Sequence, residues 1–345
     1  MRPVDLRSDT VTKPTDAMRA AIAVAEVGDD WYGDDPTVNR LQERAAELTS
    51  HAAALYCASG TMATQIALHA LVRPGHLVVC EADAHVCETE PAASAVLSGI
   101  TFRRVPAPRG LLTAALVCEA LQPDPLDVEV VDLVCAENTH LIGGGTVMPV
   151  AEMRSIHEAA RDAGLPLYLD GARVFNAAVA AGVEVADYGR EADAMMFCLS
   201  KGLGAPIGSV LCGSEDFIRE ARRVRITFGG AWRQAGIVAA AGLVALEEGP
   251  KRLHEDHERA RRLAQAVAEI LPGSLDPSGV ETNIVFVDVE SAGMRLLPTI
   301  ALLGEKGVGV LPVAGRVRMV THADVDDEDV EAAITAWREV VAEAS

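Results

Sequence analysis

The sequence contains no long uninterrupted apolar run and no recognisable export signal. Its longest apolar stretch, Ala235–Leu246, is interrupted by glycine and is too short to cross a bilayer. The N-terminal stretch MRPVDLRSDTV lacks the apolar core of a secretory signal peptide. We therefore expect no membrane partner and a cytoplasmic location.

Basic residues are scarce relative to acidic ones. The chain has 345 residues, of which 30 are Lys or Arg and 50 are Asp or Glu, so its net charge is −20. Because nucleic acid and anionic membranes repel such a chain, we expect neither as a partner. A high net charge also favours solubility in general, so the composition alone does not identify a function.

Paired cysteines and the common metal and nucleotide motifs are also missing. The seven cysteines are odd in number and form no CxxC pair, so we expect buried free thiols rather than a disulfide framework or a zinc knuckle. The stretch HEDH at His254–His257 is not HExxH and lies on a highly charged helix, which favours a solvated face over a zinc site. There is no GxSxG or GxxxxGK[ST], and GLGAPIG has one residue too many for GxGxxG. We expect no metal site.

The sequence does contain a regular alternation of strand and helix patterns. Half of its residues are hydrophobic, which is enough for a large core. Short apolar strands alternate with helices up to about residue 249, which predicts an α/β fold with a largely parallel sheet covered on both faces. Beyond Pro250, a long charged helix precedes further strands and helices. We predict an N-terminal arm and large domain at 1–249 and a small α+β domain at 250–345.

Chemically reactive side chains follow several of the predicted strands. YLDGAR places Asp170 and Arg173 after one strand, FCLSK places Ser200 and Lys201 after another, and VVCEADAH places His85 after a third. Because ligands bind at the carboxyl ends of strands in open α/β sheets, these side chains should converge. A strand-ending aspartate alone more often caps a helix. An interior lysine, however, must have its charge paired or its pKa lowered, and such a lysine suits imine chemistry on a carbonyl.

The same stretches contain the parts of a pyridoxal-phosphate site. Such a site combines a lysine with a phosphate cradle and an acid that faces the pyridine nitrogen. ASGT at Ala58–Thr61 links a strand to a helix, so Gly60 allows close backbone approach and Thr61 supplies a hydroxyl at the helix N-terminus. An ordinary N-cap is the alternative interpretation of this stretch. Asp170 is the candidate acid, and Ser200 a further phosphate contact.

Seven stretches together resemble the low-specificity L-threonine aldolases: LRSDTVTKPTDAM, VGDDWYGDDPTVNRLQERAAEL, ASGTMA, AENTH, YLDGARVFNAAVA, CLSKGLGAPIGSVLCG and RQAGIVAAAG. The resemblance extends from Val4 to the final helix. It implies a pyridoxal-phosphate enzyme of the aspartate-aminotransferase fold (fold type I), with a seven-stranded sheet in its large domain. It also implies retro-aldol cleavage of L-threonine, L-allo-threonine and related β-hydroxy-α-amino acids to glycine and an aldehyde. Other reactions on this scaffold stay open, namely β-elimination, racemisation and transamination.

The resemblance implies roles for individual residues. Lys201 would carry the cofactor through a C=N bond, Asp170 would bind its pyridine nitrogen, and His85 would stack on its ring and is the nearest candidate base. The remaining implied contacts are Gly60, Thr61 and Ser200 to the phosphate, and Ser8, Arg173 and Arg318 to the substrate carboxylate. Arg173 and Arg233 are also implied cofactor contacts, and Tyr32 is an implied substrate contact; Tyr32 and Arg233 lie near a subunit boundary in the family. Ser8 as a turn cap, Arg173 as an ion-paired helix residue and Arg318 as an exposed strand charge are the alternatives.

The resemblance further implies a homo-oligomer, a dimer with shared sites that pairs into a tetramer. The chain departs from the family at a few positions. Leu141 follows ENTH where relatives usually have asparagine, and Ile226 stands where some relatives have lysine. A histidine that some members carry ahead of the ENTH strand is absent. These departures leave the set of lysine, aspartate and phosphate contacts intact.

Overall fold

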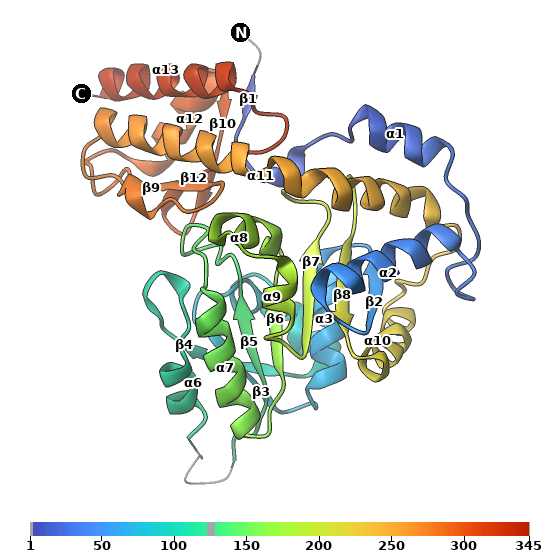
Figure 1. Ribbon diagram of the computed structural model, residues 1–345. Helices are drawn as coiled ribbons and strands as arrows, with labels where there is room; N and C mark the ends of the chain where they lie inside the picture. The colour runs from blue at the N-terminus through green and yellow to red at the C-terminus, as the bar shows by residue number, and fades with distance from the viewer. Residues whose placement is uncertain (1–2, 123–127, 345) are drawn as a thin grey trace.

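A seven-stranded sheet forms the centre of the larger part of the molecule (Figure 1). The structure is a computed structural model, and it describes residues 3–122 and 128–344. The strands lie in the order β2-β8-β7-β6-β5-β3-β4. Neighbours from β7 to β4 are parallel, whereas β8 is antiparallel to both β7 and β2. Their bounds are Ala53–Cys57 (β2), Leu77–Glu81 (β3), Thr101–Val105 (β4), Val131–Glu137 (β5), Leu167–Asp170 (β6), Ala194–Cys198 (β7) and Ser209–Gly213 (β8). The predicted mostly parallel sheet is confirmed.

Helices cover both faces of this sheet, which explains why its strands are nearly continuous apolar runs. Every residue of β7 is buried, for example. One face packs mainly against α2, α7, α8, α9 and the first half of α11, and the other against α3, α4 and α10. The helices of this part are α1 (Asp16–Ala23), α2 (Pro36–Thr49), α3 (Gly60–Leu71), α4 (His85–Glu88), α5 (Pro91–Ser98), α6 (Ala114–Ala120), α7 (Val150–Asp162), α8 (Val174–Ala181), α9 (Val185–Gly189), α10 (Glu215–Thr227) and α11 (Gly236–Ile270).

The C-terminal part has a separate hydrophobic core around a three-stranded antiparallel sheet, in the order β11-β12-β9. The second half of α11 packs against it together with two further helices. The elements are β9 (Ile284–Val287), α12 (Leu296–Glu305), β11 (Leu311–Val313), β12 (Arg316–Val320) and α13 (Asp327–Ala344). This arrangement confirms the predicted smaller α+β part.

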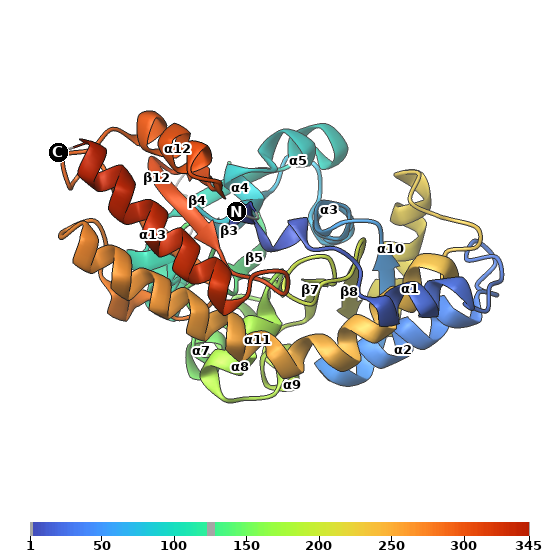
Figure 2. The ribbon, with the colours of Figure 1, turned by 90° about the horizontal axis from the view of Figure 1, so that it is seen from above.

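The N-terminal arm and α11 both connect the two parts. Strand β1 (Val4–Asp5) pairs with β10 (Val308–Gly309), so the arm starts within the C-terminal part. Figure 2 shows the dark-blue arm passing from there to α1. Helix α11 continues past Pro250 without a break. The division into 1–249 and 250–345 stays a prediction.

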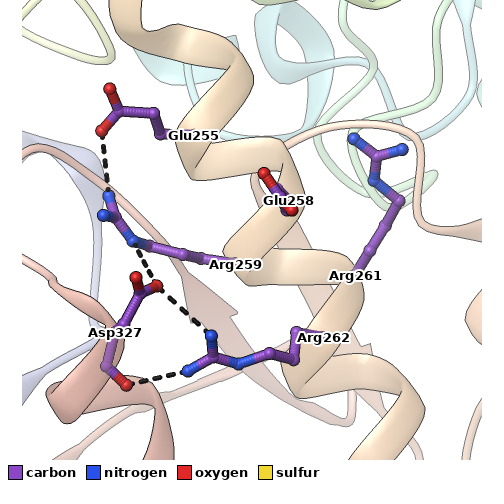
Figure 3. A pocket seen from close by; sticks show the side chains of 6 residues that line it. All are labelled: Glu255, Glu258, Arg259, Arg261, Arg262 and Asp327. Atoms are coloured by element: carbon purple, nitrogen blue, oxygen red, sulfur yellow. Dashed lines mark hydrogen bonds and ion pairs between the residues drawn. The ribbon is translucent and has the colours of Figure 1, made fainter.

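Charged side chains join α11 to the start of α13 (Figure 3). Arg259 Nε and Arg262 Nη1 lie 3.2 Å and 3.3 Å from Asp327 Oδ1. Arg262 Nη2 also donates to the Asp327 carbonyl, and Arg259 contacts Glu255. Asp327 and Arg262 are exposed, and Arg259 and Glu255 are half-buried, so each pair adds little stability. The groove that these residues line is a charged contact between helices.

The prediction of a solvated face for HEDH is only partly right. His254 is exposed, but Asp256 and His257 are buried. Asp256 forms an ion pair with Arg252, and His257 Nε2 lies 3.1 Å from Asn176 Nδ2 on α8. These residues lie where α11 crosses between the two parts, so its polar face is covered there.

All seven cysteines are free, and every one except Cys118 is buried. Among the described residues, no helix is long and apolar enough to cross a membrane. Nor does the described part of the chain hold a group of three or more His, Cys, Asp or Glu side chains placed to bind a metal ion.

Candidate active site

A cavity of about 140 Å³ lies at the carboxyl ends of the central strands. It is lined by Gly60, Thr61, Thr64, His85, Glu90, Asp170, Ala172, Met196, Cys198, Ser200 and Lys201. Six of the residues predicted from the sequence are among them: Gly60, Thr61, His85, Asp170, Ser200 and Lys201. The structure thus brings together the groups that follow β2, β3, β6 and β7, as the parallel arrangement of their carboxyl ends requires.

Lys201 stands at the start of a tight turn that returns the chain from β7 to β8. Its carbonyl accepts from Gly204 N–H at 2.8 Å, and the N–H groups of Leu199 and Ser200 both donate to the Gly208 carbonyl. Gly208 has φ = +109°, and a Cβ there would lie 2.4 Å from the Tyr56 ring. Glycine is therefore required where the turn closes, and the turn places the lysine side chain at the cavity.

Asp170 is the last residue of β6 and is buried. Its Oδ1 accepts from Ala172 N–H at 3.1 Å. A buried carboxylate requires hydrogen bonds or a positive partner, and a protonated pyridine nitrogen in the cavity provides both.

The N-terminus of α3 supplies a cradle for an anion. Ser59 Oγ caps the helix by accepting from Met62 N–H at 3.1 Å, so the alternative of an N-cap is correct for Ser59. Gly60 lies directly on β7, because a Cβ there would come within 2.9 Å of Cys198 Sγ and 3.0 Å of Met196 Cε. Because residue 60 has no side chain, the backbone N–H groups of the first turn of α3 can face a phosphate in the cavity. Ser200 also lines the cavity.

Two predicted carboxylate binders, Arg173 and Arg318, are buried but are not among the residues that line the cavity, and of the two only Arg173 is paired with a carboxylate. Arg173 donates from Nε and Nη2 to the two oxygens of Asp9, at 2.7 Å and 2.6 Å. Burial opposes ionisation of Asp9, but the charges of Arg173 and Lys201 outweigh it and lower the pKa of Asp9. Burial, reinforced by the nearby positive charge of Arg173, lowers the pKa of Arg318. The Nε of Arg318 is buried without a hydrogen-bond partner. A substrate carboxylate would satisfy this excess of positive charge.

Ser8 precedes Asp9 and caps the short 3-10 helix at residues 9–11. Its Oγ accepts from Thr10 N–H at 3.2 Å and lies 3.5 Å from Asp9 Oδ1. The alternatives of a capping Ser8 and an ion-paired Arg173 are thus both observed. Neither observation conflicts with a second role toward a bound carboxylate, and those roles stay predictions.

Tyr32 and Arg233 are not brought to the cavity within one chain. Tyr32 is 70% exposed on the loop between α1 and α2. Arg233 pairs with Asp29 at 3.0 Å, and its guanidinium lies 5.2 Å from the centre of the Trp31 ring. Their predicted contacts with substrate and cofactor are not made within one chain and stay predictions.

His85 opens α4 and is held through its backbone by the ENTH segment. Glu137 Oε2 accepts from His85 N–H at 2.6 Å, and Oε1 accepts from Leu141 N–H at 2.8 Å. The departure at Leu141 leaves this link intact because the contact uses its backbone. His140 Nε2 lies 2.9 Å from Glu81 Oε2, though without hydrogen-bond alignment. Burial lowers the pKa of His140, but Glu137 and Glu81 outweigh it and raise that pKa.

Several residues at the site were not identified from the sequence. Thr64, Glu90, Ala172, Met196 and Cys198 line the cavity, and Asp9 holds Arg173. The sequence does contain features that could have indicated the two acids, Glu90 and Asp9. Glu90 follows His85 by five residues and precedes a proline that opens a helix, and Asp9 adjoins Ser8.

The residues present fit pyridoxal phosphate. The cavity combines a lysine amine, a buried carboxylate and a helix N-terminus that only glycine could bring so close to β7. In this arrangement Lys201 would hold the aldehyde carbon, Asp170 the pyridine nitrogen, and the start of α3 with Ser200 the phosphate.

Comparison with known proteins gives the same assignment. The family model described as beta-eliminating lyase matches residues 5–292. The chain is 40% identical to a probable low-specificity L-threonine aldolase 2 of Arabidopsis thaliana, over 99% of this chain and 98% of that one. It is 39% identical to the low specificity L-threonine aldolase of Escherichia coli K12, over 98% and 99% of the two chains. The solved structure of Leishmania major threonine aldolase shares the fold, with a TM-score of 0.82, 20% identity and coverage of 98% and 100%. The chain therefore belongs to the beta-eliminating lyase family and, within it, to the low-specificity L-threonine aldolases, which are pyridoxal-phosphate-dependent lyases.

Proposed function

We propose that this protein cleaves the Cα–Cβ bond of L-threonine, L-allo-threonine and related β-hydroxy-α-amino acids, giving glycine and an aldehyde. The observation that carries the proposal is the convergence of Lys201, Asp170 and the α3 N-terminus on one cavity, with the buried arginines beside it. The names of the relatives with 39–40% identity support the same substrate class.

The arginines would fix the carboxylate of the substrate. Arg173 is held rigidly by Asp9, and Arg318 retains a buried donor without a partner. Because an arginine can donate parallel hydrogen bonds to a carboxylate, binding here would set the orientation of Cα. A fixed Cα determines which of its bonds is aligned for cleavage.

His85 is the proposed acceptor of the β-hydroxyl proton. Pyridoxal phosphate, when bound, supplies a ring that withdraws the electron pair left as Cα–Cβ breaks. The hydroxyl proton must leave in the same step, as the β-carbon becomes an aldehyde. His85 lies at the cavity wall and carries a ring nitrogen able to accept it.

The test supplies the purified holoenzyme with L-threonine. Glycine and acetaldehyde should form in equal amounts, with acetaldehyde followed by coupled reduction and glycine by chromatography. Lys201→Ala should abolish turnover, whereas Lys251→Ala, which removes an exposed lysine on α11, should leave it unchanged. A wild-type enzyme that releases no aldehyde from any β-hydroxy amino acid contradicts the proposal.

β-Elimination is the second candidate, because the matching family model is described as beta-eliminating lyase. That reaction expels the β-hydroxyl and leaves a keto acid and ammonia. The same incubation separates the two reactions: keto acid and ammonia without glycine would favour elimination.

We also propose that the active form is a homo-oligomer, a dimer of dimers. The exposed apolar side chains on and near α1 and the start of α11, namely Val24, Val27, Trp31, Tyr32 and Ile237, support this. Light scattering at micromolar concentration tests it, and a fully active monomer would contradict a shared site. The cytoplasmic location stays a prediction from the sequence.

A further inference from the structure

We propose that Glu90 is a positioning residue that holds the His85 ring in the tautomer with its proton on Nδ1. This leaves Nε2 free to accept a proton from the substrate. The inference rests on the proposed function, in which His85 takes the β-hydroxyl proton. Its starting observation is that Glu90 Oε1 lies 3.5 Å from His85 Nδ1 at the wall of the cavity.

Neither helix capping nor cofactor binding accounts for a glutamate at position 90. It occupies the N-cap position of α5, but its side chain makes no capping hydrogen bond. The residue is only 5% exposed. Burying a carboxylate is unfavourable unless it is hydrogen-bonded or paired. Of the two acids that line the cavity, Asp170 would have a partner in the pyridine nitrogen of the cofactor, so Glu90 is the one that cofactor binding leaves unexplained.

A buried polar chain orients the Glu90 carboxylate. Gln65 Nε2 donates to Glu90 Oε2 at 2.9 Å, and Ser94 Oγ donates to Gln65 Oε1 at 3.1 Å. Both Gln65 and Ser94 are buried. Because Oε2 is occupied by Gln65, the other oxygen, Oε1, is the one directed at His85.

The contact with Glu90 selects the tautomer of His85. An ionised carboxylate can only accept hydrogen bonds, so the nitrogen that faces it must carry the proton. Nε2 of the neutral ring is then the acceptor. The separation of 3.5 Å exceeds that of a well-formed hydrogen bond, and such contacts commonly shorten when substrate binds. The carboxylate would also stabilise the positive charge that forms on the ring after proton transfer.

Separate carboxylates control the backbone and the ring of His85. Glu137 accepts from the His85 N–H at 2.6 Å and so fixes the start of α4. Glu90 reaches the ring from the start of α5. A change at Glu90 should therefore disturb the ring without releasing the backbone.

The test compares Glu90→Gln with Glu88→Gln in the holoenzyme. Glutamine keeps the size of the side chain and can still accept from Gln65, but it loses the charge that faces His85. For Glu90→Gln we expect kcat to fall about 10–100-fold, as for the loss of a group that orients a reactive histidine, with KM for L-threonine nearly unchanged. Glu88 is exposed and pairs with Arg104 at 3.1 Å, so Glu88→Gln should change neither constant.

Two further readouts distinguish positioning from a general structural role. Nitrogen NMR of ¹⁵N-histidine-labelled enzyme, with the His85 signals identified by their loss in His85→Asn, should show Nδ1 protonated in the wild type and mixed tautomers in Glu90→Gln. Kinetically, Glu90→Gln should add little to the loss already caused by His85→Asn, because both changes act through one ring.

A wild-type His85 protonated on Nε2 overturns the proposal. The proposal is also overturned if Glu90→Gln lowers kcat by the same factor in the wild type and in the His85→Asn variant. Failure of the proposed function has a different signature, since the wild type would then release no glycine while the NMR result for His85 remains measurable.

Discussion

Replacing Asp9 by asparagine tests whether a buried ion pair holds the arginine that is proposed to bind the substrate carboxylate. Asp9 is fully buried and accepts from Arg173 through both of its oxygens, at 2.7 Å and 2.6 Å. Asparagine keeps the shape but replaces one acceptor with a donor that faces the guanidinium. Arg173, itself 6% exposed, is then left without its counter-charge.

Removing one partner of a buried pair costs about 3–5 kcal/mol. At about 2 °C per kcal/mol for a chain of this size, the melting temperature of Asp9→Asn should fall by roughly 6–10 °C. The folded state lowers the pKa of Asp9 because Arg173 outweighs burial. The stabilisation is therefore present above the unfolded pKa of about 4 and is lost as the pH falls through the lower folded value. At pH 7 the melting temperatures of Asp9→Asn and the wild type should therefore differ by the full amount.

Thermal unfolding of the apoprotein at pH 7 measures this effect. Asp162→Asn, which changes an exposed aspartate on α7, is the matched control and should shift the free energy of unfolding by less than about 0.5 kcal/mol. Adding Arg173→Met to Asp9→Asn should recover part of the loss, because the unpaired charge is then gone. The KM for L-threonine should also rise in Asp9→Asn. Wild-type stability together with an unchanged KM would refute the role assigned to Asp9.

Further predictions concern the cradle and the buried histidine of α11. Gly60→Ala places a Cβ within 2.9 Å of Cys198 Sγ and should weaken pyridoxal-phosphate binding about tenfold, or about 1.4 kcal/mol, in an absorbance titration. Gly304→Ala, where a Cβ meets no atom within 4 Å, is the control, and equal affinity in both variants would contradict the cradle. Burial lowers the pKa of His257 from 6.5 to about 4, so its neutral form stabilises the fold above pH 6.5 and this stability is lost as the pH falls toward 4. From pH 7 to pH 5 the wild type should lose about 2 kcal/mol more than His257→Gln in urea unfolding, and equal losses would argue against a buried neutral ring.

The sheet and the centre of the site could be predicted from the sequence because their signals are local. A continuous apolar run such as that of β7 indicates a strand buried on both faces, and the residues that follow such strands meet at one edge. Lys201, Asp170 and His85 were placed together by this rule alone, and Gly60 by its position between a strand and a helix. The cavity contains all of them.

Contacts between distant parts of the chain could not be predicted in this way. Asp9 and Arg173 are separated by 164 positions, and no periodic pattern connects them. The burial of His257 depends on α8 packing against a helix whose own sequence is highly charged. The pairing of β1 with β10 likewise joins opposite ends of the chain. Tyr32 and Arg233 do not line the cavity within one chain, so their roles stay predictions that rest on the proposed oligomer.

Borohydride reduction followed by peptide mass mapping tests the central claim most directly. The claim is that the amine at the end of β7 holds pyridoxal phosphate in the cavity at the sheet edge. Holoenzyme reduced with borohydride should carry one pyridoxyl-phosphate group per chain, on the peptide that contains Lys201, and Lys201→Ala should carry none. Stoichiometric labelling at another lysine, or no labelling of a folded wild-type enzyme saturated with the cofactor, would contradict the account.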